Sequence, residues 1–245
     1  MKNKEQITEI PNFLGRAESA ALLKNLFDRR QIWEARKERR VSYRNGDWYT
    51  LGSSLYLDLK SEQQYGEYVE KSLYWQSMLN DPTIKPFLDE IRLRLEKNVF
   101  GKKTFFLADI DNQGIAKTKM PVGYPGFHIF PGHETASAFF GRKHQDRQHE
   151  SLFQIPLIKD NFKKENVSMH FSFTIPLRLP YMGGGMLLGS NLEEFYPYKE
   201  NSLYMHSGHF DHAIAPFMTP VLPSDWRITI QGHGFVYNEN IYLYW

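Results

Sequence analysis

The second half of the chain is a series of short segments rich in aromatic and β-branched residues, separated by Gly, Pro and Asn. Such segments predict β-strands, and many short strands at this spacing are typical of a sandwich or barrel rather than of alternating strand and helix units. We therefore expect a jelly-roll in this half. The predicted strands are Thr104–Ile110, Gly126–Phe130, Phe139–Asp146, Ser168–Leu177, Met186–Leu188, Ser202–His206, His212–Pro216, Trp226–Gln231 and Asn240–Trp245.

The first half has a different pattern, in which apolar residues recur three and four positions apart. This spacing is typical of amphipathic helices. It predicts helices from Arg16 to about Arg39, over Tyr65–Trp75, and from Pro82 to Val99. One exception is Trp48–Leu57, which follows an Asn-Gly turn signal and is expected to be extended.

These patterns predict an α+β fold, in which a mainly helical N-terminal part (residues 1–100) packs on a jelly-roll, cupin-like core (residues 101–245). No linker or internal repeat divides the sequence, and all-β barrels and sandwiches often reach this length undivided. We expect one domain over residues 1–245.

Composition excludes several classes of function. The chain has no cysteine, so disulfides, thiolate metal sites and cysteine nucleophiles are excluded. The formal net charge is only +2, with basic residues spread along the chain, so we expect no nucleic-acid partner. Neither a secretory signal nor a membrane-spanning apolar run is visible, so we expect a cytoplasmic protein without a membrane partner. The oligomeric state stays open.

His144 and Asp146 are the first residues that point to chemistry. They lie two positions apart, so on an extended chain both side chains point to the same face. His212 offers a third ligand. His206 shares its parity and His209 lies close by, but His212 is preferred because an apolar run ending in a proline follows it. Two histidines and one carboxylate on one side of an ion leave other positions open, as expected for non-heme Fe(II).

Arg227 and Thr229 form a second pair, on one face of the predicted strand over Trp226–Gln231. Burying an arginine is costly unless an anion pairs with it, and its planar guanidinium suits a carboxylate. The alternative is an arginine that bridges to a structural Asp or Glu.

Taken in order, His144-Gln145-Asp146, the distal His212 and Arg227-Ile228-Thr229 resemble the His-x-Asp, His, Arg-x-Ser/Thr pattern of the Fe(II)/2-oxoglutarate-dependent oxygenases. The resemblance covers about residues 104–245. Between His212 and Arg227 the gap is at the long end of the family's pattern, and a looped insertion would absorb the excess.

The resemblance implies a double-stranded β-helix that holds Fe(II) through His144, Asp146 and His212 and binds 2-oxoglutarate through Arg227 and Thr229, with O₂ as the other cosubstrate. It implies hydroxylation of an unactivated carbon of a small polar molecule such as a free amino acid. Halogenating members replace the metal-binding carboxylate with a small residue, and this chain keeps Asp146. The alternatives are a protein or peptide side-chain hydroxylase and a non-catalytic jelly-roll binding protein with a metal site.

Substrate contacts are predicted at His128, Phe130, Arg142 and Trp245. Arg142 has the parity of His144 and Asp146, and its charge suits a substrate carboxylate. Residues 147–166 are polar and charged and follow the metal ligands directly, so we expect them to form a mobile lid.

Overall fold

A computed structural model describes residues 6–36, 48–59, 64–111, 119–133, 141 and 143–245. Tertiary contacts divide the chain into two compact units. Unit 1 comprises Met1–Leu51, Phe127–Asp146 and Phe173–Gln231, and unit 2 comprises Gly52–Gly126, Arg147–Ser172 and Gly232–Trp245. Each unit is described by itself below. The prediction of a single domain stays a prediction.

Most strands of unit 1 belong to one large sheet, in the order β1-β9-β6-β11-β5-β3-β2. Where residue partners are assigned, neighbours in this path run antiparallel, as in β1 with β9 and β3 with β5. The strands are β1 (Ile7–Ile10), β9 (Leu203–His206), β6 (Val167–Arg178), β11 (Trp226–Tyr237), β5 (Gly126–Pro131), β3 (Trp48–Leu51) and β2 (Glu34–Arg36). Strands β6 and β11 contribute residues to both units.

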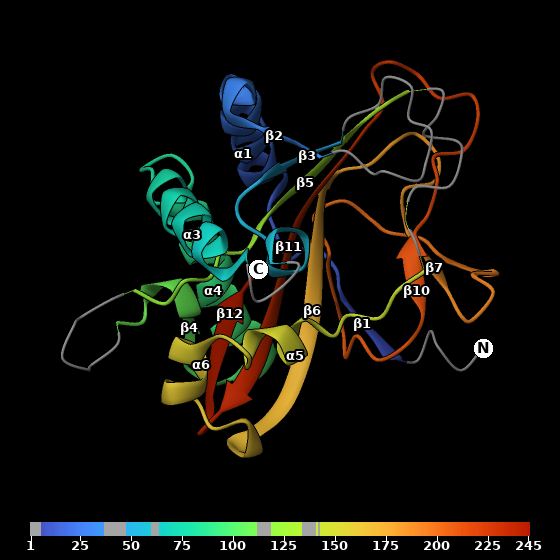
Figure 1. Cartoon of the computed structure of the whole chain (residues 1–245). Coiled ribbons are helices and arrows are strands. Elements are labelled where there is room, and N and C mark those ends of the chain that lie inside the picture. The colour runs from blue at the N-terminus through green and yellow to red at the C-terminus, as the bar shows by residue number, and fades with distance from the viewer. Residues whose placement is uncertain (1–5, 37–47, 60–63, 112–118, 134–140, 142) are drawn as a thin grey trace. The chain divides into compact units, whose positions relative to one another are not determined.

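A second sheet of unit 1 has the order β10-β7-β8 and is antiparallel throughout. Its strands are β10 (His212–Ile214), β7 (Met186–Leu188) and β8 (Glu194–Tyr196), and β7 and β10 lie side by side in Figure 1.

Two apolar clusters pack strands of the large sheet against this smaller sheet. One joins residues of β1 and β9 to residues of β7, and the other joins Phe130 of β5 to Phe217, with Ile214 of β10 packed against both. The first cluster contains Ile7, Met186, Leu188, Tyr204 and Phe210. Helices combined with two packed, largely antiparallel sheets confirm the mixed α+β class and support the jelly-roll. The double-stranded β-helix itself stays a prediction.

Helix α1 (Arg16–Asp28) buries Leu22 and Leu26 on one face, as its periodicity predicts. The prediction that this helix continues to Arg39 is wrong. After Asp28 come a 3₁₀ turn (Arg30–Ile32) and strand β2. The indole N–H of Trp33 donates to the Leu26 carbonyl oxygen at 3.1 Å, so the chain folds back along the end of the helix. Residues 37–39 lie outside the described residues.

Unit 2 contains most of the helices. The predicted helices over Tyr65–Trp75 and from Pro82 to Val99 are confirmed as α3 (Tyr65–Leu79) and as α4 (Lys85–Arg94), which a π-helical turn (Leu95–Phe100) extends. Strand β4 (Thr104–Phe106) pairs in parallel with β12 (Asn240–Tyr244), and β12 pairs antiparallel with the C-terminal part of β11.

The expectation that Trp48–Leu57 is extended throughout is partly wrong. Strand β3 ends at Leu51, and a short helix, α2 (Leu55–Asp58), follows. The carboxylate of Asp58 accepts a hydrogen bond from the Ser54 N–H at 2.9 Å and pairs with Lys71 at 2.6 Å. The first contact satisfies the Ser54 N–H before the helix, and the second ties the helix to α3.

Residues 147–166 form helices α5 (Gln148–Leu152) and α6 (Pro156–Asn161), beside β12 in Figure 1. Five apolar side chains of the segment are buried, those of Leu152, Phe153, Ile155, Ile158 and Phe162, and Phe162 packs on Tyr242 of β12 with ring centroids 4.9 Å apart. Although the segment is polar in composition, these buried side chains give it apolar contacts with the rest of unit 2. Its role as a lid stays a prediction.

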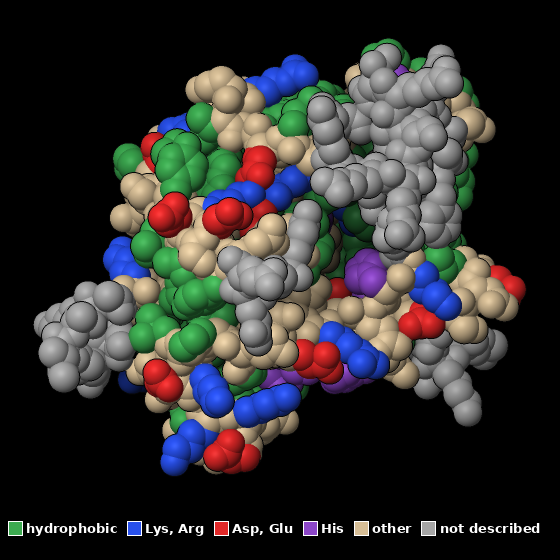
Figure 2. Space-filling model, viewed as in Figure 1, with side chains coloured by type: hydrophobic (Ala, Val, Ile, Leu, Met, Phe, Trp, Pro, Cys, Tyr) green, Lys and Arg blue, Asp and Glu red, His purple; other side chains and the backbone are tan. Residues whose placement is uncertain are grey.

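On the face drawn in Figure 2, acidic and basic side chains of the described residues are intermixed rather than gathered by sign. In the part of the chain that the structure describes, no helix has the length and apolar character needed to cross a membrane.

Candidate metal centre

Backbone pairing between two distant segments of unit 1 brings the candidate ligands together. His144 and His212 form an isolated antiparallel bridge, in which the His144 N–H donates to the His212 carbonyl at 2.9 Å and the His212 N–H donates back at 3.0 Å. The Asp146 N–H donates to the Gly208 carbonyl at 2.8 Å. The predicted strand over Phe139–Asp146 lies partly outside the described residues, and within them it is reduced to this bridge.

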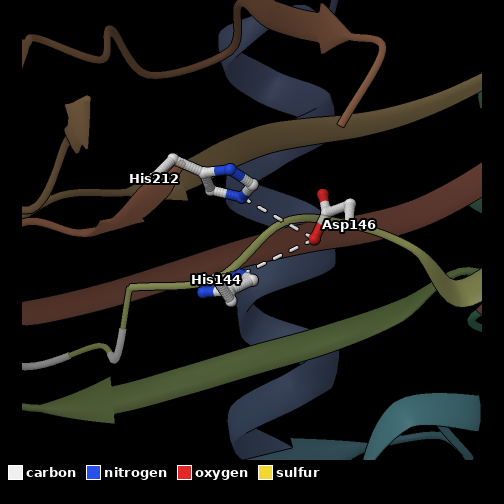
Figure 3. A group of neighbouring side chains, drawn as sticks. All are labelled: His144, Asp146 and His212. Atoms are coloured by element: carbon white, nitrogen blue, oxygen red, sulfur yellow. Dashed lines mark ion pairs between the residues drawn. The ribbon is translucent and has the colours of Figure 1, made fainter. Parts of the chain in front are cut away.

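The three side chains converge as predicted. The Nε2 atoms of His144 and His212 each lie 3.6 Å from Oδ1 of Asp146, and each residue offers one ligand atom within 4.8 Å of the others. Figure 3 shows both imidazoles directed at the same carboxylate oxygen. Two imidazole nitrogens and one carboxylate oxygen form the donor set of a facial triad, so these residues fit a non-heme Fe(II) ion.

A backbone contact prepares His212 for this role. Its Nδ1 lies 3.0 Å from the Phe210 carbonyl oxygen. A carbonyl can only accept a hydrogen bond, so Nδ1 carries the proton and the lone pair of Nε2 faces Asp146. This tautomer is the one that a metal ligand bonded through Nε2 requires.

Burial and charge act in opposite directions on the pKa of His212. Burial alone lowers it, but Asp146 stabilises the protonated ring by its negative charge and as a hydrogen-bond acceptor, and together with the Phe210 carbonyl it raises the pKa above its ordinary value. A proton therefore competes with a metal ion for His212 at a higher pH than for an ordinary histidine.

The site is open on one side, because the side chain of His144 is 45% exposed while that of His212 is 7% exposed.

Asp211 ties the two ligand segments together. Its carboxylate accepts a hydrogen bond from the Gln145 side-chain amide at 2.9 Å and pairs with Lys143 at 3.5 Å. The hydrogen bond from Gln145, followed by the charge of Lys143, holds the pKa of Asp211 below its ordinary value although burial opposes this. These contacts flank His144 and His212 and restrict how far the bridge between them can open.

Arg227 and Thr229 lie on one face of β11, as predicted. Arg227 is 1% exposed, its Nε donates to the Gly184 carbonyl at 2.8 Å, and its Nη1 lies 3.4 Å from the Thr229 hydroxyl. The guanidinium carbon of Arg227 also lies over the Phe130 ring, 5.5 Å from the ring centroid. The long gap between His212 and Arg227 is absorbed by a loop after β10, which Phe217 fixes through a bridge to Gly183.

The predicted substrate contacts belong to both units, and one of them lies outside the described residues. His128 is buried on β5, 5.1 Å from the ring of Trp48 and 6.0 Å from that of Phe130. Trp245 is buried in unit 2, and a Cβ on Gly52 would lie 2.9 Å from its ring. Arg142 lies outside the described residues. Roles for these four residues in substrate binding stay predictions.

Tyr198 and Thr174 were missed in the sequence. The Tyr198 hydroxyl is hydrogen-bonded to Thr174 and lies within electrostatic range of both Arg227 and Asp146. Burial raises the pKa of Tyr198 well above its ordinary value, although Arg227 and Thr174 lower it. Tyr198 stacks on Tyr204 with centroids 4.3 Å apart. Tyr198 belongs to no predicted strand, so parity could not assign it to a face.

Comparisons with known proteins bear on the fold. No protein-family model matches the chain, and no curated protein matches it. Among solved structures, the non-heme α-ketoglutarate-dependent epimerase SnoN from nogalamycin biosynthesis is similar over 94% of this chain and 77% of its own, with a TM-score of 0.51 and 11% identity.

Two further solved structures have lower scores. A Pseudomonas putida prolyl-4-hydroxylase has a TM-score of 0.41 at 16% identity, covering 95% of this chain and 93% of its own. An N-substituted L-amino acid dioxygenase from Burkholderia ambifaria has a TM-score of 0.45 at 10% identity, covering 74% of this chain and 70% of its own. The similarity to SnoN concerns the fold: this chain shares the fold of that non-heme α-ketoglutarate-dependent enzyme, as the resemblance found in the sequence implies.

Proposed function

We propose that this protein is an Fe(II)/2-oxoglutarate-dependent dioxygenase that hydroxylates an unactivated carbon of a small polar molecule, such as a free amino acid. The observation that carries the proposal is the convergence of the Nε2 atoms of His144 and His212 on Oδ1 of Asp146. The His212 tautomer set by Phe210 supports it.

In this proposal His144, Asp146 and His212 hold the metal on one face. Bound there, Fe(II) with 2-oxoglutarate and O₂ supplies the oxidising power to hydroxylate a C–H bond, with succinate and CO₂ as the other products. The buried sides of His212 and Asp146 keep water from that half of the site, and the exposed side of His144 leaves a path for small molecules.

Arg227 anchors the carboxylate of 2-oxoglutarate remote from the metal. Its burial supports this role, because a guanidinium removed from water gains most from a carboxylate partner. Thr229 and the Tyr198 hydroxyl, which is linked to Thr174, can donate further hydrogen bonds to the same carboxylate. The Phe130 ring, whose centroid lies 5.5 Å from the guanidinium carbon, adds a cation–π contact to the arginine.

Succinate release tests the reaction class. Metal-free protein is loaded anaerobically with Fe(II) and 2-oxoglutarate and then exposed to air. We expect succinate from the wild type and none from the His144→Ala, Asp146→Ala or His212→Ala variants. His209→Ala is the matched control, because His209 is an exposed histidine on the same segment as His212. A folded, metal-loaded wild type that forms no succinate would contradict the proposal and favour a non-catalytic binding protein.

The substrate class is tested by adding free amino acids and related small acids to the same assay. A true substrate increases succinate release and gains the mass of one oxygen atom. If peptides respond and free amino acids do not, the protein or peptide side-chain hydroxylase is the correct alternative.

A further inference from the structure

The second oxygen of Asp146 faces another histidine. The Nε2 atom of His206 lies 3.8 Å from Oδ2 of Asp146, while His144 and His212 approach Oδ1. The side chain of His206 is only 3% exposed. Its ring centroid lies 5.1 Å from that of Phe210 and 5.0 Å from that of His212. His206 therefore has little room to rotate.

Backbone partners give His206 and His212 opposite tautomers. The Gly208 N–H donates to Nδ1 of His206 at 3.1 Å, whereas Nδ1 of His212 faces the Phe210 carbonyl. An N–H can only donate, so Nδ1 of His206 carries the lone pair and the proton of the neutral ring is on Nε2. His212 thus presents a lone pair on the Oδ1 side of Asp146, and His206 presents an N–H on the Oδ2 side.

We propose that His206 is a positioning residue for the metal-binding carboxylate, an inference that rests on the metal site of the proposed function. Its Nε2–H attracts Oδ2 of Asp146 and holds the carboxylate so that Oδ1 faces the metal. Held in this way, the carboxylate would offer one oxygen to a metal ion bound by His144 and His212. Carboxylates that bind metals are commonly held by polar neighbours that do not touch the metal, and removing one typically weakens metal binding 10- to 100-fold.

Gly208 completes this arrangement. Its φ is +77°, and a Cβ there would lie 2.6 Å from the Cβ of Asp146. Its N–H binds His206 while its carbonyl accepts the Asp146 N–H. One glycine therefore orients both the carboxylate and the histidine that holds it.

Three substitutions separate positioning from packing. His206→Gln keeps a donor near the place of Nε2, His206→Asn keeps an acceptor near Nδ1 but has no donor near Nε2, and His206→Phe keeps the ring volume without either group. The probe is Co(II), titrated into metal-free protein and followed by its visible absorption, with circular dichroism to establish folding.

We expect Co(II) affinity to fall about 10- to 100-fold in the Phe and Asn variants and to return to within about 3-fold of wild type in the Gln variant. His209→Phe should match wild type. If the Phe variant does not fold, the comparison of Asn with Gln decides the question.

Affinity in the Asn variant equal to wild type, or in the Gln variant as low as in the Asn variant, would overturn the inference and leave His206 a packing residue. These results differ from failure of the proposed function, in which the wild type itself binds no Co(II) or releases no succinate on loading with Fe(II).

Discussion

His144 and His212 exchange two backbone hydrogen bonds, at 2.9 Å and 3.0 Å, and their imidazole rings lie 4.4 Å apart. Two residues paired in this way are directly opposite, so their side chains leave the same face of the bridge. One pair of backbone contacts thus sets the separation of two metal ligands. Changes that disturb the bridge should affect metal binding before they affect the fold.

The first prediction concerns Gly208→Ala. The added methyl would lie 2.6 Å from the Cβ and 2.8 Å from the carbonyl oxygen of Asp146, so Asp146 must move. We expect at least about a 10-fold loss of Co(II) affinity, together with a loss of about 1–2 kcal/mol of folding stability from the left-handed backbone. The matched control is Gly101→Ala, which has φ +61° and nothing within 4 Å of the added methyl. It should lose similar stability and keep its metal affinity. Equal affinities in the two variants would contradict the prediction.

The second prediction concerns Asp211→Ala. This change removes the acceptor for Gln145 and the ion-pair partner of Lys143, and so frees the segment that carries His144. Because these contacts are partly exposed, we expect a moderate effect of about 2- to 10-fold on Co(II) affinity and a stability change below about 1 kcal/mol. Faster amide exchange at residues 143–146 should accompany it. As a control, Asp28→Ala removes an exposed ion pair with Lys24 on α1. It should change neither the Co(II) affinity nor the amide exchange at residues 143–146.

The third prediction concerns Arg227→Lys. Lysine keeps the charge but loses the planar fork, so a bound carboxylate keeps at most one of two parallel hydrogen bonds. Calorimetric titration of 2-oxoglutarate into Co(II)-loaded protein should show a dissociation constant raised about 10- to 100-fold, with Co(II) affinity itself unchanged. The control is Arg30→Lys, in which the replaced guanidinium lies over Trp33 and Trp226. This variant should bind 2-oxoglutarate like wild type. If both variants bind 2-oxoglutarate like wild type, Arg227 is a structural arginine.

The fourth prediction concerns the alkaline stability of unit 1. Burial raises the pKa of Tyr204 from 10.0 to about 12, although the hydrogen bond from the Lys199 N–H lowers it in part. Between these pH values the unfolded chain releases a proton that the folded chain keeps, so this contribution to stability is complete below pH 10 and is lost as pH rises through about 12.

Tyr204→Phe tests this directly by urea unfolding at pH 8 and pH 11. At pH 8 the variant should be about 1 kcal/mol less stable, because it lacks the hydrogen bond with Lys199. The difference in unfolding free energy between the variant and wild type should narrow at pH 11. The wild type loses stability there because Tyr204 ionises in the unfolded chain, and the variant has no phenol at this position. If the stability difference between Tyr204→Phe and wild type does not change with pH, the raised pKa of Tyr204 is contradicted.

The sequence by itself determined the features that depend on local periodicity. Alternation along an extended chain was enough to predict that His144 and Asp146 share a face, and that Arg227 and Thr229 share another. The spacing of apolar residues predicted α3 and α4 for the same reason, because side-chain direction in a helix or strand follows from residue number.

Only the tertiary structure decided the features that depend on a distant backbone group. The end of α1 follows from Trp33, whose ring packs on Trp226 at 6.1 Å, and no local pattern marks that contact. His206 and His212 have the same parity, so alternation could not assign their roles. Their difference arises because Nδ1 of one meets the Gly208 N–H and Nδ1 of the other meets the Phe210 carbonyl. Which backbone group meets an imidazole depends on the folded path of the whole loop, and that choice fixes which histidine offers a metal its lone pair and which holds the carboxylate.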